Sequence, residues 1–456
     1  MTHSSGKSIS DYLKPGMHAH LVGIGGVSMR PLGLVLRSQG LTISGSDMNA
    51  SVSTDELIQN GITVYIGHKA DNIQGADCII RTAAAHNDNP EIAAARANGI
   101  PVFERAQAWG VIMQNYENAI CVAGTHGKTT TTSMITQIFM EAKQDPTVMI
   151  GGTLPLIHAG HRVGSGKTII LESCEYCNSF LNFYPTVALI LNVEADHLDF
   201  FKDLPDIQRS FRKFAQLVPE NGAIIANGDD PNTVETLRGL QYLSFGIGDR
   251  NDVYGCNFSK DWRSFDVICE GTPYAHLELA VVGRHNALNA IAACAAAYHA
   301  GLPGRVVELA LASFSGAGRR MEYKGSYHGA DVYDDYAHHP AELHALLTAC
   351  KTMGYSRIIC AFQPHTYTRT SALMHDFIRE LLAADIAVLT DIYAARERNL
   401  IGISSSMIAD RIPGAVYRPT LQDVTTYLQE IAQPGDLILT VGAGDIYKAG
   451  DALLKL

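Results

Sequence analysis

Short apolar runs that end in glycine or polar residues, each followed by a stretch with helical spacing, recur along the whole chain. In the first part these runs alternate with helical stretches, as strands and helices do in βα units. The expected strands there are residues 18–22, 41–47, 63–66, 78–81 and 101–103. They predict a parallel sheet over about residues 16–112, and Asn87 to Pro90 is typical of a turn or a helix start.

The middle part of the chain repeats the alternation with longer apolar runs. A strand at 119–123 leads through a glycine-containing turn into a helix that begins at Lys128. Helical spacing is carried by Met134, Ile135, Ile138 and Phe139. Further strands are expected at 168–171 and 187–191, and an alanine-rich helix ends near Tyr298.

A third part begins near Gly318, with strands expected at 332–334, 357–361, 386–389 and 437–441. The length of 456 residues fits about three domains. The pattern therefore predicts an α/β protein with an N-terminal Rossmann-like domain at 1–112, a central P-loop ATPase-like domain with a parallel sheet at 113–317, and a C-terminal Rossmann-like domain at 318–456.

Composition narrows the class of function. A chain with 46% apolar and 18% charged residues supports large cores. The net charge of −11, without a basic cluster, argues against a nucleic-acid partner. No apolar run reaches 18 residues and no secretory segment opens the chain, so neither a membrane span nor export is expected. Nine scattered cysteines favour a reduced, cytoplasmic setting, and Cys174 and Cys177 lack the second pair of a zinc site.

The segment VAGTHGKTTTT at 122–132 is the most informative motif. A strand, a glycine turn, a Lys-Thr pair and a helix start coincide there, as in a phosphate-binding loop. Backbone N–H groups at the helix start can bind an anion, Lys128 can reach β/γ-phosphate oxygens, and the Thr129 hydroxyl can bind Mg²⁺. The usual pattern has glycine at the position of Val122, so this loop is a shortened variant. The alternative is a threonine-rich helix cap with a solvated lysine.

Two other groups of polar residues follow expected strands. Gly23, Gly25 and Gly26 form a dinucleotide-type turn, and Asp47 ends the next strand, where an acid can bind ribose hydroxyls. In the central part, Glu172 and His197 follow two strands whose carboxyl ends face the ligand crevice. Glu172 suits Mg²⁺, whereas His197 is an unusual ligand for so hard an ion and could be a structural histidine. Asn286 and Asn289 can meet an adenine edge or cap a helix.

Taken together and in order, the motifs resemble the Mur ligases of peptidoglycan synthesis. They are GIGG at 23–26, SGSD at 44–47, AGTHGKTT at 123–130, NVEADHLD at 192–199, GRHN at 283–286, RRME at 319–322, DDYAHHP at 334–340 and QPH at 363–365. The resemblance spans essentially the whole chain. It implies an ATP-dependent, amide-bond-forming ligase with a UDP-sugar domain, a central ATPase domain and a C-terminal domain that closes over both.

Within this family the motifs match best the branch that joins L-alanine to UDP-N-acetylmuramate, with ATP and Mg²⁺ as cofactors. The resemblance implies that the muramoyl carboxylate attacks the γ-phosphate, and that the amine of L-alanine then displaces phosphate from the acyl phosphate. Such chemistry needs positioned positive charge more than covalent help. Lys128, Arg320 and Mg²⁺ are expected to supply it, and the residues expected to be catalytic are Lys128, His197, Arg320, His338 and Arg369.

The resemblance also assigns binding roles. ATP is expected at Gly124, Thr125, His126, Gly127, Lys128, Thr129, Thr130, His285, Asn286, Asn289, Arg320 and Asp335. The UDP-sugar is expected at Gly23, Gly25, Gly26, Ser46, Asp47 and His68. The metal is expected at Thr129, Glu172 and His197, and the muramoyl and alanine end at Tyr336, His338 and Arg369.

Three departures from the family pattern limit these assignments. The segment usually written Glu-Ala-Asp-Glu-Ser is ESCEY at 172–176, which keeps Glu172 but weakens the case for Glu175. Thr366 replaces a common arginine, which leaves Arg369 as the cation of that loop. Lys213 lies near the place of a carbamoylated lysine in other Mur ligases, and no role is assigned to it.

Three other functions stay open from the sequence. A sister ligase that recycles murein tripeptide onto the same UDP-sugar shares the AGTHGKTTT loop. The N-terminal glycine turn with Asp47 is also typical of NAD-dependent oxidoreductases, although the Lys128 loop argues against that class. A non-catalytic nucleotide sensor would bind ATP without turnover.

Overall fold

The computed structural model describes residues 8–198, 200–395 and 397–455. These residues form three sheets with helices against them, so the predicted α/β class is confirmed. They divide into two compact units. One holds the described residues up to Gly151 with Ile157–Glu194 and Pro205–Ser244, and the other holds Gly152–Leu156, Ala195–Leu204 and the described residues from Phe245.

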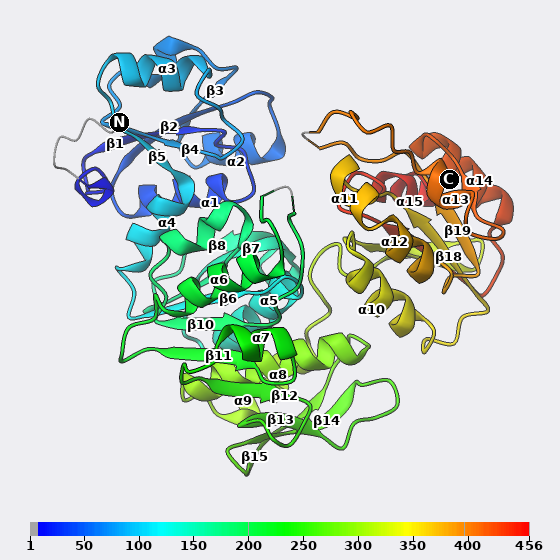
Figure 1. Cartoon of the computed structure of the whole chain (residues 1–456). Helices are drawn as coiled ribbons and strands as arrows, with labels where there is room; N and C mark the ends of the chain where they lie inside the picture. Colours follow the sequence, from blue (N-terminus) through cyan, green and yellow to red (C-terminus); the bar gives the residue numbers. More distant parts are fainter. Residues whose placement is uncertain (1–7, 199, 396, 456) are drawn as a thin grey trace. The chain divides into compact units, whose positions relative to one another are not determined.

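The N-terminal sheet has five parallel strands in the order β3-β2-β1-β4-β5. This is a doubly wound arrangement, with the glycine turn directly after the central strand. Figure 1 shows helices on both sides of this sheet. Its elements are η1 (Ile9–Asp11), β1 (His18–Val22), α1 (Met29–Ser38), β2 (Thr42–Asp47), α2 (Val52–Gln59), β3 (Thr63–Ile66), η2 (Ala70–Ile73), β4 (Cys78–Arg81), α3 (Pro90–Ala97), β5 (Val102–Glu104) and α4 (Arg105–Met113).

Local chemistry explains the element boundaries in this part. Asn89 caps α3 by accepting the N–H groups of Glu91 and Ile92, and Pro90 occupies the first helical position, where no N–H is needed. On α4 the indole of Trp109 is completely buried, and its Nε1 donates to the Ser28 carbonyl at 3.2 Å. Trp109 therefore ties α4 to the end of the glycine turn.

The central sheet has ten strands in the order β15-β14-β13-β12-β11-β10-β6-β9-β7-β8. The strands β7, β9, β6, β10 and β11 pair in parallel, whereas β13, β14 and β15 form an antiparallel meander. The strands are β6 (Asn118–Ala123), β7 (Thr147–Leu154), β8 (Ala159–Arg162), β9 (Thr168–Glu172), β10 (Val187–Ile190), β11 (Ala223–Asn227), β12 (Leu243–Gly246), β13 (Val253–Cys256), β14 (Ser264–Cys269) and β15 (Thr272–Glu278). The helices are α5 (Lys128–Glu141), η3 (Pro155–Ile157), η4 (Tyr176–Asn182), α6 (Leu204–Ala215), α7 (Pro231–Thr236), α8 (Arg284–His299) and α9 (Gly304–Ala312).

The third sheet has six strands in the order β16-β17-β21-β18-β19-β20, all parallel except the edge strand β16. Leu343, Phe377 and Ile408 belong to the core on one face, and Val424 and Leu453 to the core on the other. The elements are β16 (Glu322–Tyr327), β17 (Ala330–Asp335), α10 (Pro340–Cys350), β18 (Arg357–Phe362), α11 (Tyr367–Ala372), α12 (Met374–Leu381), β19 (Ile386–Leu389), α13 (Ser406–Ala409), β20 (Val416–Tyr417), α14 (Leu421–Ile431), β21 (Asp436–Val441) and α15 (Tyr447–Leu454).

The cysteines and the helices bear on two expectations from the sequence, namely a reduced setting and no membrane span. All nine cysteines are free thiols, and Cys174 and Cys177 are exposed. Within the described residues, no helix combines the length and the apolar character needed to cross a bilayer.

Candidate functional site

The phosphate loop joins β6 to α5 through two glycines with positive φ. Gly124 has φ +149°, and a Cβ there would lie 2.9 Å from Leu191; Gly127 has φ +82°, in the left-handed region that favours glycine. The turn delivers Lys128, Thr129 and Thr130 to the first turn of α5, where backbone N–H groups have no partner within the helix. The loop is therefore built as an anion site.

Lys128 is held in place before any phosphate arrives. Its Nζ donates to the carbonyls of Gly124 and Thr125, the latter at 3.0 Å, and lies 3.1 Å from Glu175 Oε2. Burial alone would lower the pKa of Lys128, but Glu175 and Glu172 raise it above its usual value. The ammonium is thus charged at neutral pH and fixed over the loop.

Thr129 and Glu172, two of the three expected metal ligands, are neighbours. The Thr129 hydroxyl lies 3.0 Å from both carboxylate oxygens of Glu172, at the end of β9. Glu172 also accepts the Gly151 N–H at 2.6 Å. A hydroxyl and a carboxylate form a hard oxygen donor set that fits Mg²⁺. The third expected ligand, His197, belongs to the other unit.

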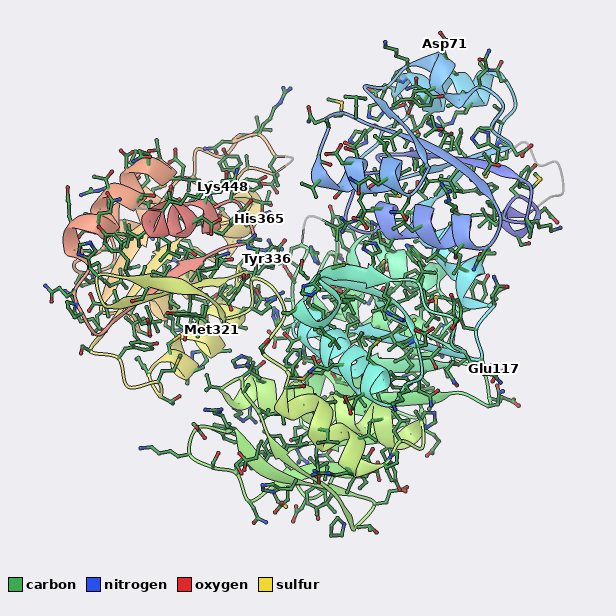
Figure 2. The ribbon with its side chains drawn as sticks, turned by 180° about the vertical axis from the view of Figure 1, so that it is seen from behind. Asp71, Glu117, Met321, Tyr336, His365 and Lys448 are labelled. Carbon is green, nitrogen blue, oxygen red and sulfur yellow. The ribbon has the colours of Figure 1, made fainter. Side chains whose placement is uncertain are left out.

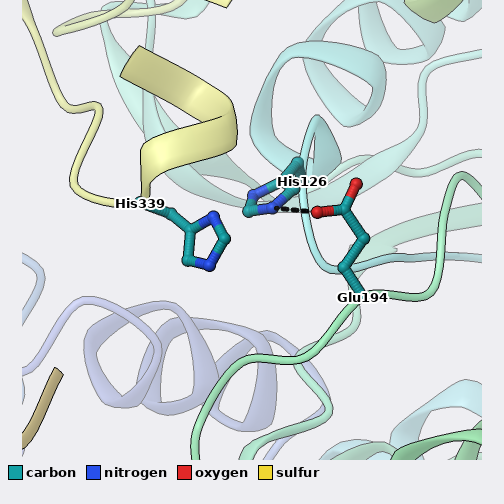
Figure 3. Close-up of side chains that lie close together, drawn as sticks. All are labelled: His126, Glu194 and His339. Carbon is teal, nitrogen blue, oxygen red and sulfur yellow. Dashed lines mark ion pairs between the residues drawn. The ribbon is translucent and has the colours of Figure 1, made fainter. Parts of the chain in front are cut away.

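The chain after β10 is bonded to the phosphate loop. The Asn192 carbonyl accepts the Thr125 N–H at 3.1 Å, and its side-chain Oδ1 accepts the His126 N–H at 2.8 Å. Glu194 donates its N–H to the Thr125 hydroxyl at 2.9 Å, and its carboxylate lies 3.4 Å from His126 Nε2 (Figure 3). Thr125 and His126 therefore shape the loop through contacts of their own.

The residues expected near adenine lie at the start of α8. Asn286 is buried, and its Nδ2 donates to the Val282 carbonyl at 2.9 Å, as a helix-terminal amide does. Burial, and secondarily the Arg320 cation, lowers the pKa of His285 to about 4. Asn289 is half-buried on the same helix. Trp262 lies beside this segment, with the Arg284 guanidinium 5.9 Å from its ring.

Asp335 is buried and bonded to backbone. Its two oxygens accept the N–H groups of Met321 and Ala337, each at 2.8 Å. Burial raises the pKa of Asp335 to about 6, although Arg320 opposes the shift. Arg320 itself lies 5.2 Å from the Tyr336 ring and 3.8 Å from Glu342. Asp335 thus fixes the loop that presents Tyr336 and Arg320.

The residues expected at the muramoyl and alanine end gather after β17 and β18 (Figure 2 labels Tyr336 and His365). The His338 ring centroid is 5.4 Å from that of Tyr336 and 6.0 Å from that of His365. Burial lowers the pKa of His338 to about 4, so its imidazole is neutral at neutral pH. Arg369 lies 3.3 Å from His365 Nδ1.

Arg369 also forms an ion pair that the sequence did not predict. Its Nη2 and Nε lie 3.0 and 3.4 Å from Asp196 Oδ1, and both side chains are nearly buried. Burial by itself would raise the pKa of Asp196, but Arg369 and His197 lower it below its usual range. His197 has φ +52° and donates its N–H to Asp196 Oδ1 at 2.7 Å. Asp199, the last residue of this motif, lies outside the described residues.

The residues expected to bind the UDP-sugar lie at the carboxyl ends of β1, β2 and β3. Asp47 Oδ2 accepts the Gly25 N–H at 2.9 Å, which joins the end of β2 to the turn of Gly23, Gly25 and Gly26. Ser46 is fully buried, and its hydroxyl and His68 Nδ1 are 2.9 Å apart. The sequence therefore predicted residues that the fold brings together.

Two acidic residues beside these sites received no role from the sequence. Glu175 pairs with Lys128, although the altered motif had weakened its case. Glu91 accepts the Ser46 hydroxyl at 2.5 Å and lies 3.1 Å from His68 Nδ1. Its only sequence signal was its place in the first turn of a helix, where acids are common for electrostatic reasons alone.

Comparisons with known proteins agree along the whole chain. Family models described as "Mur ligase family, catalytic domain", "Mur ligase middle domain" and "Mur ligase, glutamate ligase domain" match residues 18–117, 122–297 and 319–444. The UDP-N-acetylmuramate–L-alanine ligase of Agathobacter rectalis is 46% identical over 455 residues, covering 98% of this chain and 99% of the relative.

Solved structures give the same picture. A UDP-N-acetylmuramate-alanine ligase from Thermotoga maritima is 28% identical with a TM-score of 0.81, covering 96% of this chain and 98% of its own. A murein peptide ligase from Psychrobacter arcticus is 24% identical with a TM-score of 0.73, over 96% of this chain and 98% of its own. The second likeness shows a common fold.

Proposed function

This chain belongs to the Mur ligase family, and we propose that it joins L-alanine to the muramoyl carboxylate of UDP-N-acetylmuramate with consumption of ATP. The observation that carries the proposal is the phosphate loop, in which Lys128 is a preorganised cation and Thr129 lies against the carboxylate of Glu172 at the end of β9. The 46% identity to a ligase of this name supports the substrate assignment.

The proposed reaction has two steps. A carboxylate oxygen of the muramoyl group bonds to the γ-phosphorus while the bond to the β–γ bridging oxygen breaks, which releases ADP. The nitrogen of L-alanine then bonds to the acyl carbon, phosphate leaves, and the amine loses a proton. Both steps develop negative charge on phosphate oxygens, which a fixed cation stabilises.

The chain's residues divide these tasks. Lys128 neutralises the transferring phosphate, and the N–H groups of Gly127, Thr129 and Thr130 bind its oxygens. Thr129 and Glu172, with His197, would hold Mg²⁺, which neutralises charge on the phosphates when bound. Arg320, His285, Asn289 and Asp335 are assigned to ATP.

Binding of the other substrates is assigned to the two ends of the chain. We assign the UDP part to the glycine turn with Asp47 and His68, within a domain of residues 1–112. The muramoyl and alanine end is assigned to Tyr336, His338 and Arg369, within residues 318–456. The intervening residues 113–317 form the ATP domain in this proposal. The nine free cysteines support a reduced, cytoplasmic location in this proposal.

The decisive experiment supplies UDP-N-acetylmuramate, Mg·ATP and either L-alanine or murein tripeptide, and measures phosphate release with mass analysis of the product. We expect phosphate release with L-alanine and a product with one added alanine residue. Turnover with the tripeptide alone would establish the recycling ligase instead. ATP binding without turnover would indicate a nucleotide sensor.

A further inference from the structure

A buried carboxylate lies within the N-terminal sheet domain. Glu91, in the first turn of α3, has no solvent exposure. Its Oε2 accepts the Ser46 hydroxyl at 2.5 Å and lies 3.1 Å from His68 Nδ1, and its Oε1 accepts Asn72 Nδ2 at 2.6 Å. The three partners come from β2, from the turn after β3 and from η2, so one side chain joins three separate segments.

Polar residues on the sheet itself extend this network. His20 on β1 is opposite Ser44 on β2, and its Nδ1 lies 2.8 Å from the Ser44 hydroxyl. His18 Nε2 lies 2.8 Å from the same hydroxyl, and His20 Nε2 lies 3.8 Å from Glu91. Parallel strands covered on both faces are normally apolar. Packing alone therefore does not explain the polar side chains on these two strands.

A contribution to the stability of the fold does not explain this buried polar network. Burial alone would raise the pKa of Glu91, but the nearby His20 and the hydrogen bonds from Ser46 and Asn72 lower it to about 2. The carboxylate is therefore ionised, and an ionised group is costly to remove from water. Replacing a buried charge network with apolar residues is often neutral or stabilising.

The network instead touches the segments that carry the expected UDP-sugar residues. Ser46 precedes Asp47, whose carboxylate bonds to the glycine turn at Gly25. Asn72 also donates to the Gly67 carbonyl at 3.1 Å, and the Gly67 N–H donates to the Asp47 carbonyl at 2.7 Å. Each contact fixes the end of β2 or the turn that presents His68, where ligands bind in such sheets.

We propose that Glu91 is a positioning residue for the UDP part of UDP-N-acetylmuramate, an inference that rests on the proposed function for the identity of the ligand. By holding Nδ1 of His68, Glu91 sets the orientation of the ring and leaves Nε2 as the nitrogen that is not engaged by this carboxylate. By accepting the Ser46 hydroxyl, it fixes the strand end that places Asp47. Preorganisation of this kind reduces the ordering that binding must otherwise impose.

The test is Glu91→Gln, which keeps the shape and removes the charge. We expect the KM for UDP-N-acetylmuramate, and the Kd for UDP alone by calorimetry, to rise about 10- to 100-fold, as loss of hydrogen bonds to a charged group does. The KM values for ATP and L-alanine should stay within about twofold. Glu104→Gln is the control, because Glu104 forms an ion pair with Arg81 in the same sheet and its side chain is 41% exposed, whereas Glu91 is fully buried; it should leave every value within about twofold.

Two further variants separate positioning from folding. If Glu91 acts through His68, the double variant Glu91→Gln/His68→Gln should bind UDP no more weakly than the weaker single variant. Ser46→Ala keeps the carboxylate and removes one hydrogen-bond donor to it, so it should show the same selective loss of UDP affinity. It provides the test if Glu91→Gln does not fold. Additive effects, an equal rise in the KM for ATP, or unchanged UDP affinity in Ser46→Ala would each overturn the inference.

The outcome also separates this inference from the proposed function. A wild-type enzyme that forms ADP with L-alanine, together with a folded Glu91→Gln variant of normal UDP affinity, overturns only the role of Glu91. A wild-type protein that binds UDP without alanine-dependent turnover, and loses UDP affinity in Glu91→Gln, refutes only the ligase assignment. Calorimetry with UDP alone supplies this distinction.

Discussion

Removal of the Lys128 ammonium should affect both catalysis and folding. The ammonium lies 3.1 Å from Glu175, whose side chain is 3% exposed. Lys128→Ala removes a preorganised charge from a phosphoryl-transfer site, which typically costs about 3 to 4 kcal/mol of transition-state stabilisation, or about 10²- to 10³-fold in kcat. It also leaves Glu175 buried without that partner, and breaking a buried pair typically destabilises a fold by about 3 to 5 kcal/mol.

The double variant Lys128→Ala/Glu175→Gln separates the two effects. It removes the unpaired charge, so stability should return toward the wild-type value while kcat stays low. Phosphate release measures kcat, and urea denaturation measures the free energy of unfolding. Lys167→Ala is a matched control, because Lys167 and Glu117 form a pair at 2.7 Å with side chains 74% and 65% exposed. Such pairs contribute less than about 1 kcal/mol, and Lys167 is outside the proposed site.

Either of two results would contradict the catalytic role of Lys128. If the double variant recovered both stability and turnover, Lys128 would be a structural partner of Glu175 and no part of the phosphoryl-transfer machinery. A folded single variant with near-normal kcat would lead to the same conclusion.

Four other outcomes follow from the described contacts. Glu172→Gln should lower kcat and regain part of it at high Mg²⁺, because it weakens an oxygen ligand and leaves Lys128 in place; titration of activity with Mg²⁺ checks this. Asp47→Ala should raise the KM for the UDP-sugar about 10-fold with that for ATP unchanged, since it frees the glycine turn; equal effects on both would contradict it. Arg369→Ala should lower kcat/KM for the UDP-sugar or L-alanine about 10²-fold, with ATP affinity by calorimetry unaffected. The pKa of His285 falls to about 4 on folding, so between that value and about 6.5 the native state binds fewer protons than the unfolded state. The free energy of unfolding therefore falls as the pH is lowered through this range. Denaturation at pH 7 and pH 5 should show that His285→Gln loses up to about 2 kcal/mol less of this free energy than the wild type.

The sequence predicted many of the parallel strands because their pattern is local, but the parallel strands β7, β11, β12 and β20 were not predicted. Buried strands such as β6, β10 and β18 are continuous apolar runs that end in glycine or polar residues, and this signal depends on no distant partner. Strands β13 to β15 were missed because only alternate residues are buried in these short segments, so none carries a continuous apolar run. Strand β16 was missed because it is an antiparallel edge strand without a buried run.

The residues of the candidate site likewise divide into those that a local motif predicts and those that only the fold brings together. Lys128 and Thr129 were evident because a phosphate loop is one continuous segment. Glu175 and Glu91 gain their importance from partners 47 and 45 residues away, at Lys128 and Ser46. No spacing rule connects such pairs, because only the folded sheet brings them together. The pair of Asp196 and Arg369 is separated by 173 residues and was unpredicted for the same reason.

The hydrogen bond from the Trp109 indole to the Ser28 carbonyl suggests an intrinsic fluorescence assay for ligand binding. The chain has two tryptophans, of which Trp109 is bound to the glycine turn and Trp262 lies beside the start of α8. We expect UDP binding at this turn to change the environment of the Trp109 indole, which donates the hydrogen bond, and therefore its emission. In a Trp262→Phe variant, titration with UDP should change the remaining fluorescence, while ATP should leave it nearly constant. One native residue would then report occupancy of one nucleotide site without any attached dye.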